Sequence, residues 1–404
     1  MKKKILFVIE SLVCAGAEKS LVTLLNMLDY SKYEVDLQLF SYGGGFEELL
    51  PREVNLLPEL PYFSLTKESL KALLLRSKST AEIKMFYSRI KYSLSLRKRK
   101  YSNPEKAVLF WKNTRHCFSK SEKIYDIAIA YAQCVPTFYV VDCVNAKKKY
   151  AWINAVYTPE KNFREFNINY YNAIDKIVCV SDDAHKIFDN HFPELASKSC
   201  IIYDINDAKF IEKMAGLKSE ASKEMDFGGS KILTVGRLAP QKGYDIAIEA
   251  GKILKSHNID YKWYILGKGP LEKQLKNQVE EENLTDNFVF LGTRANPYPY
   301  FKLSDIYVQT SKFEGFGLAI AEARMLNIPV VTTRFSAVYE QMIDGSNGLV
   351  VNVDAESVAN GIESLIQNHK LYEKIRDFQK HEKKGNAEEI QKIYKLLDGE
   401  YENE

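Results

Sequence analysis

The sequence predicts an α/β fold with two doubly wound parallel sheets, and three observations carry this prediction. Short apolar runs recur along the 404-residue chain and alternate with segments of helical periodicity. A chain of this length ordinarily forms two domains. The polar, glycine-containing stretch 215–229 has no periodicity and divides the alternating pattern into two series, so we expect it to be the linker between the domains.

The first series predicts an N-terminal domain over residues 1–214. Residues 4–9 are expected to form its first strand rather than a signal peptide, because Glu10 and Ser11 interrupt the apolar run. A helix with a leucine face is expected over residues 18–28. Further strands of this domain are expected at 34–40, 54–57, 126–130, 149–153, 176–180 and 200–203.

The second series predicts a C-terminal domain over residues 230–374. Each of its apolar runs is followed by a helical pattern, which is typical of a parallel sheet with crossover helices. Its strands are expected at 231–235, 261–266, 288–291, 306–309, 329–332 and 348–351.

Composition excludes several classes of protein. The hydrophobic share of 46% is that of a globular chain, and a net charge of +3 implies no polyanion-binding tail. The six cysteines include no Cys-x-x-Cys pair, so reduced, buried thiols in a cytosol are favoured over disulfides or zinc. The histidines show no metal-ligand spacing, and no metal site is expected.

A strand–turn–helix signature between residues 306 and 325 carries the strongest functional signal. Two glycines and a carboxylate, Glu314, follow the strand-like run, and a second carboxylate, Glu322, lies in the helix-like run. Exposed N–H groups and the helix dipole at a helix N-terminus suit a phosphate. Glu314 can face a ligand from the turn, and Glu322 can accept a ribose hydroxyl. The alternative is a plain strand–turn–helix with two surface acids.

A second signature lies upstream, after the strand expected at 231–235. Gly236 allows a turn, and the cations Arg237 and Lys242 precede a helix expected to start near Tyr244. Two cations beside a helix N-terminus suit a diphosphate, and arginine can bind it bidentately. We expect both side chains to face an open cleft; a solvated basic loop is the alternative.

Together these segments resemble the retaining family-4 glycosyltransferases of the bacterial surface-polysaccharide type, which have the glycosyltransferase-B fold. The resemblance is tight over residues 229–370 and looser over 1–228. The segments that carry it are Gly236-Arg237, Lys242-Gly243, Leu266 to Pro270, Phe290 to Gly292, Asn296 to Tyr298, Ser311 to Ala323, and Asp344-Gly345 with Gly348.

The resemblance implies two Rossmann-like domains that face each other across a cleft. The N-terminal domain would be the acceptor side, residues 230–374 the nucleotide-sugar donor side, and residues 375–404 would return to the first domain. The implied enzyme is a hexosyltransferase. It moves a sugar from a nucleotide-diphospho sugar to a hydroxyl of a glycan or lipid-linked glycan with anomeric retention, without a metal or another cofactor. Capsule and lipopolysaccharide synthesis is the implied setting.

The resemblance also assigns roles to individual residues. Arg237 and Lys242 would stabilise the leaving diphosphate, and Glu314 would bind sugar hydroxyls in the transition state, so these three are the expected catalytic residues. The expected donor-binding residues are Gly16, Asn154, Gly236, Gly267, Gly315, Phe316, Gly317, Leu318 and Glu322.

The residue at position 154 departs from the family pattern, which usually has a histidine there. Asparagine can hydrogen-bond a sugar hydroxyl but does not titrate near neutral pH. This departure leaves open a non-catalytic sugar-binding subunit that supports a partner transferase. A second alternative, a nucleotide-sugar 2-epimerase, shares the same fold, although the Arg/Lys loop and the glutamate spacing fit a transferase better.

A basic segment, residues 67–112, remains outside these motifs. It holds thirteen Lys or Arg against three Asp or Glu, and residues 66–100 predict one long amphipathic helix. A basic amphipathic helix suits an anionic membrane surface, whereas a solvated charged face over a core helix is the alternative. No apolar run approaches the ~20 residues of a membrane span, and no nucleic-acid module is recognisable. We therefore expect a cytoplasmic protein, peripheral on the inner face of the membrane.

Overall fold

The computed structural model divides the chain into two compact units, and each is described by itself. Unit 1 comprises residues 1–205 and 387–404, and unit 2 comprises residues 206–386. The part of the chain that the structure describes is residues 2–13, 16–69, 79–97, 99–154, 161–314, 317–335 and 337–401.

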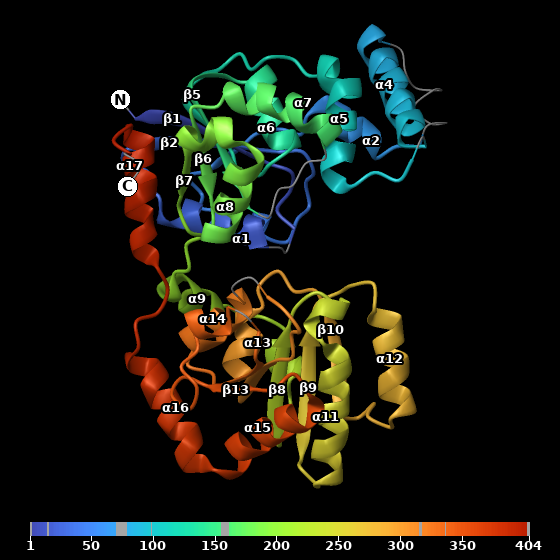
Figure 1. Cartoon of the computed structure of the whole chain (residues 1–404), viewed down its shortest axis with the longest axis vertical. Helices are drawn as coiled ribbons and strands as arrows, with labels where there is room; N and C mark the ends of the chain where they lie inside the picture. Colours follow the sequence, from blue (N-terminus) through green and yellow to red (C-terminus); the bar gives the residue numbers. More distant parts are fainter. Residues whose placement is uncertain are drawn as a thin grey trace. The chain divides into compact units, whose positions relative to one another are not determined.

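Unit 1 is built on a parallel sheet of seven strands in the order β3-β2-β1-β4-β5-β6-β7 (Figure 1). Its strands are β1 (Lys3–Ile9), β2 (Tyr33–Leu39), β3 (Asn55–Leu56), β4 (Ile124–Ala130), β5 (Asn145–Ile153), β6 (Lys176–Cys179) and β7 (Ser199–Ile201). Its helices are α1 (Gly16–Met27), α2 (Pro61–Thr66), α4 (Thr80–Leu96), α5 (Asn103–Thr114), α6 (Val135–Cys143), α7 (Lys161–Asn172), α8 (Asp182–His191) and α17 (Ile390–Asp398).

Unit 2 is built on a parallel sheet of six strands in the order β10-β9-β8-β11-β12-β13. Its strands are β8 (Ser230–Val235), β9 (Tyr261–Leu266), β10 (Phe288–Gly292), β11 (Ile306–Gln309), β12 (Val330–Thr333) and β13 (Leu349–Val351). Its helices are α9 (Ala208–Ala215), α10 (Ala221–Glu224), α11 (Tyr244–Ser256), α12 (Glu272–Glu281), α13 (Tyr298–Leu303), α14 (Leu318–Met325), α15 (Ala355–Gln367) and α16 (His369–His381).

Both sheets have the strand order of a doubly wound nucleotide-binding fold, in which the chain leaves the first strand toward one edge and then returns to its other side. Every strand pair is parallel, and the central strands are buried on both faces, which is why the sequence shows continuous apolar runs rather than alternation. The predicted fold class is confirmed.

The unit boundaries differ from the expected ones at two places. The stretch expected as linker, 215–229, belongs to unit 2, where the Asn296 amide donates to Met214 O at the end of α9 (2.8 Å) and Arg294 pairs with Glu224 of α10. The boundary between unit 1 and unit 2 lies between residues 205 and 206 instead. Within 215–229 the helix α10 is a single turn that buries only Ala221, so this stretch has no clear apolar period.

The C-terminal return also begins later than residue 375. Ile375 of α16 is fully buried in the unit 2 core, whereas residues from 387 onward belong to unit 1. There α17 lies beside the start of the first sheet (Figure 1): the Lys3 ammonium pairs with Asp398 at 2.7 Å, and the rings of Tyr33 and Tyr394 stack with centroids 6.0 Å apart.

The prediction of a single long helix over residues 66–100 is wrong for the described residues of this segment. Helix α2 ends at Thr66, and α4 begins at Thr80 behind a capping box in which Ser79 and Glu82 bond each other's backbone N–H. The Ser-x-x-Glu signal of such a box is visible in the sequence. Residues 70–78 lie outside the described residues.

Candidate functional site

The expected donor-site residues of unit 2 gather at the carboxyl ends of β8 and β11. These two strands are neighbours at the centre of the sheet, and β8 also pairs with β9 on its other side. The crossover connections diverge here toward the two edges, so the loops separate and leave room at the carboxyl ends of the strands. The loop after β8 carries Arg237 and Lys242, and the loop after β11 carries Glu314.

Glycines allow the loops at this edge to touch through their backbones. Gly267, directly after β9, has a φ of +146°, and a Cβ there would lie 1.9 Å from the carbonyl oxygen of Gly236. Gly243 has a φ of +62°, and a Cβ there would lie 2.0 Å from the carbonyl oxygen of Thr310. The structure thus gives Gly267 a packing role; its expected contact with a donor remains a proposal.

A polar cluster fixes the carboxylate of Glu314. Its Oε1 atom accepts three hydrogen bonds: from Lys242 Nζ at 2.5 Å, from Ser311 Oγ at 2.6 Å and from Gln309 Nε2 at 3.2 Å. The Oε2 atom accepts none from a described residue. One oxygen is therefore anchored by the protein, and the other is available as an acceptor.

Buried neighbours hold this cluster rigid. Gln309 and Ser311 are 2% and 0% exposed, and the Tyr307 hydroxyl donates to Gln309 Oε1 at 2.8 Å. Burial raises the pKa of Tyr307 well above its ordinary value, and the charges nearby add to this, so its hydroxyl stays a donor. Sequence reasoning missed Gln309 and Tyr307; a glutamine inside an apolar strand was the available signal.

Lys242 and Arg237 occupy different environments, although both were expected to face open space. The Lys242 side chain is only 19% exposed and pairs with Glu314. Its backbone is held as well, because Thr310 Oγ1 donates to Lys242 O at 3.0 Å. The Arg237 side chain is exposed and makes no hydrogen bond or ion pair with the described residues. The expectation of an open position is therefore wrong for Lys242 and fits Arg237.

The helix after β11 begins as the sequence predicts. Gly317, with a φ of +80°, is the N-cap of α14, and its carbonyl accepts a hydrogen bond from Gln341 Nε2 at 3.2 Å. Leu318 is the first helical residue, and Glu322, one turn later, is 6% exposed. The Ile320 N–H donates to Gly317 O at 2.9 Å, whereas the N–H groups of Leu318 and Ala319 have no partner among the described residues, which suits an anion. Gly315 and Phe316 lie outside the described residues.

The remaining two expected site residues, Gly16 and Asn154, belong to unit 1. Gly16 begins α1 and is exposed. Asn154 follows β5; its amide nitrogen donates to Tyr131 O at 2.6 Å, and its Oδ1 is buried without a partner among the described residues. The side chain is therefore oriented, with an acceptor oxygen available.

Sequence reasoning missed a buried polar group beside Asn154. The hydroxyls of Ser20 and Tyr131 lie 2.9 Å apart, and Ser20 Oγ donates to Asp204 Oδ1 at 2.5 Å. Burial raises the pKa of the Asp204 carboxyl to about 6. No motif marks these residues, which meet only because α1, β4 and the segment after β7 converge.

The described residues offer neither a metal site nor a membrane-spanning helix. No group of three or more His, Cys, Asp or Glu side chains is arranged to hold a metal ion. None of the described helices is both long enough and apolar enough to cross a bilayer. The described cysteines are free thiols, and all but Cys117 are buried.

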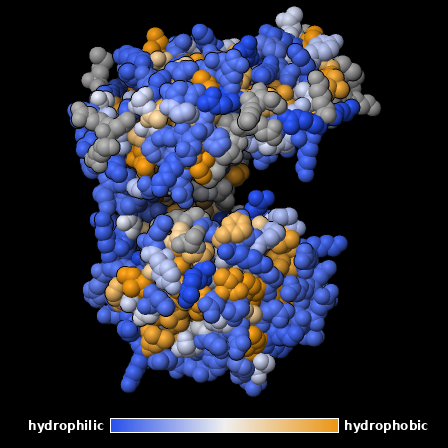
Figure 2. Space-filling model, in the orientation of Figure 1, coloured by the Kyte–Doolittle hydropathy of each residue, from blue (hydrophilic) through white to orange (hydrophobic). Residues whose placement is uncertain are grey.

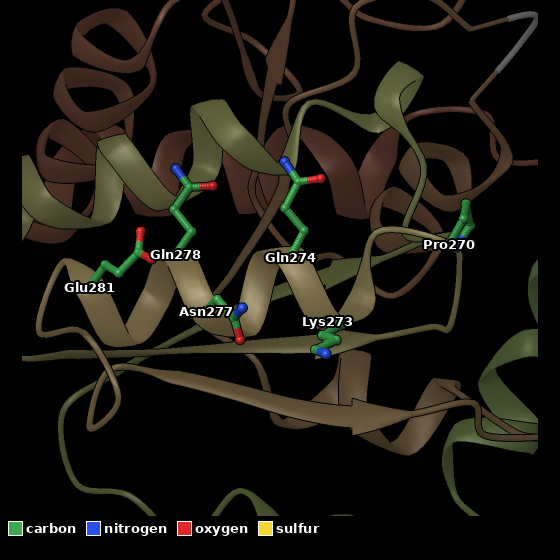
Figure 3. Close-up of a pocket in the computed structure, with 6 residues that line it drawn as sticks. All are labelled: Pro270, Lys273, Gln274, Asn277, Gln278 and Glu281. Atoms are coloured by element: carbon green, nitrogen blue, oxygen red, sulfur yellow. The ribbon is translucent and has the colours of Figure 1, made fainter.

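A hollow of about 580 Å³ lies on α12, away from this polar cluster (Figure 3). The side chains of Gln274 and Gln278 project from the same side of the helix, and Pro270 lies in the loop before it. Apart from Pro270 the lining residues are polar, and none of them belongs to the cluster around Glu314. The hollow has no convergent charges and is not part of the candidate site.

Comparison with known proteins agrees with this geometry. Residues 218–382 match the family model described as "Glycosyl transferases group 1". The chain is 32% identical over 202 residues, 49% of this chain and 52% of the relative, to an N-acetylgalactosamine-N,N'-diacetylbacillosaminyl-diphospho-undecaprenol 4-alpha-N-acetylgalactosaminyltransferase of Campylobacter jejuni. It is 31% identical over 146 residues, 34% of this chain and 42% of the relative, to the lipopolysaccharide core biosynthesis mannosyltransferase LpsB of Rhizobium meliloti. The chain spans about half the length of the curated relatives it matches.

Similarity to solved structures extends over the whole chain but at lower identity. The Anabaena protein HepE in complex with UDP and glucose superposes with a TM-score of 0.65 at 19% identity, covering 98% of this chain and 100% of that one. The lipopolysaccharide glycosyltransferase WaaG superposes with a TM-score of 0.55 at 14% identity, covering 98% of this chain and 100% of that one. These superpositions establish the glycosyltransferase-B fold.

Proposed function

We propose that this chain, which carries a group 1 glycosyltransferase domain over residues 218–382, transfers a sugar from a nucleotide-diphospho sugar to a hydroxyl of a glycan. The observation that carries the proposal is the polar cluster at the carboxyl ends of β8 and β11. There Glu314 is anchored through one oxygen, with Lys242 beside it and an exposed Arg237 on the same loop as Lys242.

The diphosphate of the donor would bind to Arg237, Lys242 and the first N–H groups of α14. Arg237 has no partner within the described residues, so its guanidinium can bind two phosphate oxygens without breaking a contact. Lys242 would lie between Glu314 and the phosphate. Negative charge grows on the diphosphate as the glycosidic bond breaks, and fixed cations stabilise it more in the transition state than in the ground state.

The sugar would bind to Glu314 through the available Oε2 atom. The anchoring of Oε1 by Lys242, Ser311 and Gln309 holds that second oxygen in one direction, which preorganises the contact. We further propose that Glu322 binds the nucleotide ribose. In unit 1, the acceptor oxygen of Asn154 and the backbone at Gly16 are proposed to contact the donor.

The finer features of the reaction are also proposals. We propose a hexosyl donor with UDP as the first nucleotide to test, because HepE, with the same fold, binds UDP and glucose. Anomeric retention without a metal ion is proposed from the resemblance of the motifs. A lipid-linked glycan acceptor is proposed because the Campylobacter relative is named for transfer to a diphospho-undecaprenol glycan. With such an acceptor, the sugar would be transferred at the inner face of the membrane.

A donor screen tests this function. The purified chain is incubated with UDP-glucose, UDP-galactose, UDP-N-acetylglucosamine and GDP-mannose, with and without a glycolipid extract, and release of nucleoside diphosphate is followed. Slow release without acceptor, accelerated by the extract, supports the transferase. Epimerised donor without release would instead identify a 2-epimerase. Binding of a donor with neither product would identify a sugar-binding subunit.

A further inference from the structure

Helix α4 of unit 1 has one face fixed against the protein. Arg89 donates from Nη1 to the carbonyl oxygens of Leu65 (3.3 Å) and Glu68 (2.7 Å), which ties the helix to the end of α2. The buried Ser88 hydroxyl lies 2.9 Å from His116 Nε2, behind α5. These contacts set the rotation of α4 about its axis and therefore determine which residues face outward.

The outward face carries an apolar stripe. Ile83, Tyr87 and Leu94 are 43%, 65% and 54% exposed, and Ile90 lies half-buried between them. Their spacing of four, three and four residues places all four on one side of a helix. Single exposed apolar residues are ordinary, whereas a continuous exposed stripe of this kind marks an interaction surface.

Unpaired cations border this stripe. Lys84, Lys91, Arg97 and Lys100 are exposed, and none forms an ion pair or side-chain hydrogen bond with the described residues. The acid in α4, Glu82, is engaged at the N-terminal cap. The pKa of the adjacent His116 is lowered by burial and by repulsion from Lys84, Lys91 and Arg115. This lowering is consistent with a surplus of positive charge around α4.

The stripe and its cations are concentrated on α4. Figure 2 shows hydrophobic and hydrophilic atoms side by side over this helix, which is labelled in Figure 1. In helix α5 of the same basic segment, Val108 and Trp111 are both 0% exposed, and no described apolar residue of this helix is fully exposed. Among the described residues of the segment, the candidate docking surface is therefore the outward face of α4 together with Arg97 and Lys100.

We infer that the outward face of α4 docks on an anionic lipid bilayer, with the helix lying in the interface. An anionic bilayer surface is complementary to this face in two ways: its apolar layer can bury the stripe, and its negative headgroups can bind the bordering cations. A second copy of the chain would bring like charges together across a symmetric contact. A nucleic acid would place phosphates against Ile83 and Leu94. The inference does not rest on the proposed transfer reaction.

Vesicle sedimentation with the full chain tests the docking. Vesicles of phosphatidylcholine are compared with vesicles that also contain phosphatidylglycerol. The wild type is expected to bind only the second kind. Raising the ionic strength from about 0.1 to about 1 M shortens the screening length from about 10 to about 3 Å and should release it. Lys84→Gln/Lys91→Gln should bind about 25-fold more weakly, about fivefold for each lysine.

The apolar contribution is tested separately. Tyr87→Ser/Leu94→Ser should weaken binding about tenfold or more while the charge stays the same. The matched control is Lys273→Gln/Lys370→Gln, which removes two exposed, unpaired lysines from unit 2 and should bind like the wild type. All substituted side chains are exposed, so thermal melting of the variants should match the wild type. If one variant fails to fold, the other variant and the salt series still decide the question.

Three outcomes would overturn the inference. Equal binding of the wild type to both kinds of vesicle would show that attraction between the cations and negative headgroups does not contribute to docking. An equal loss in the unit 2 control would show that any positive charge suffices. A concentration-dependent dimer in sedimentation velocity, lost in Tyr87→Ser/Leu94→Ser and without vesicle binding, would identify a second copy as the occupant.

Discussion

Removing the Lys242 charge should destabilise unit 2, and removing the Glu314 charge as well should restore much of that stability. The two side chains form an ion pair with a 2.5 Å contact and are 19% and 10% exposed. In Lys242→Met, the carboxylate keeps its bonds from Ser311 and Gln309 but loses its ion-pair partner. The double variant Lys242→Met/Glu314→Gln leaves no net charge in the cluster.

The size of the effect follows from the burial. Leaving one charge of a fully buried pair without its partner costs about 3–5 kcal/mol. The Lys242–Glu314 pair retains some solvent contact and two further donors, so we expect about 1–3 kcal/mol for Lys242→Met. For a unit of this size each kcal/mol moves the Tm by about 2–4 °C, which gives a shift of about 2–12 °C.

Calorimetric or fluorescence-monitored unfolding of the four proteins in this cycle measures the coupling. We expect an interaction free energy of about 1–3 kcal/mol, so that the double variant is more stable than the sum of the single losses. Lys273→Met, at an exposed lysine on α12, is the control and should not change the Tm. Additive losses in the double variant would refute the view that Lys242 and Glu314 act as one structural unit.

Three further predictions concern other parts of the molecule. Gly267→Ala should lower the free energy of unfolding by about 2–4 kcal/mol, because its Cβ would meet Gly236 O, whereas Gly228→Ala, in open space, should leave the Tm unchanged. Glu322→Gln should raise the KM for donor with little change in kcat, whereas Glu314→Gln should lower kcat; steady-state kinetics that show the reverse would exchange their roles. The raised pKa of Asp204 adds stability that is complete below about pH 3.8 and is lost as the pH rises through about 6. Asp204→Asn should therefore stabilise the protein by up to about 3 kcal/mol near neutral pH but not near pH 4, and equal gains at both pH values would contradict this.

The fold was predictable because both sheets are buried on two faces. Strands such as Ile306–Gln309, with every residue buried, appear in the sequence as apolar runs bounded by helical patterns. Boundaries were less predictable. Helix α10 is a single turn in which only Ala221 is buried, so residues 215–229 resembled a linker, and α16 is charged outside but inserts Ile375 into the core.

The site was predictable where glycines and charges stand next to strand ends. The positions of Arg237, Lys242, Glu314 and Gly317 after β8 and β11 follow from local sequence. The pairing of Lys242 with Glu314 could not be predicted from local sequence, because the two residues are 72 positions apart and meet only when the strands lie side by side. Contacts of this kind depend on tertiary packing rather than on any local pattern.

The central claim is that the carboxyl ends of β8 and β11 bind the diphosphate of a nucleotide sugar. Titration calorimetry with UDP and GDP tests it most directly in the wild type, Arg237→Gln and Arg52→Gln. Arg52 is an exposed arginine of unit 1 without a partner among the described residues, so both variants lose the same charge. The account predicts that Arg237→Gln binds about tenfold or more weakly, as expected when a charge-assisted contact is lost, and that Arg52→Gln binds like the wild type. Equal affinity of all three proteins, or no binding by the wild type, would contradict it.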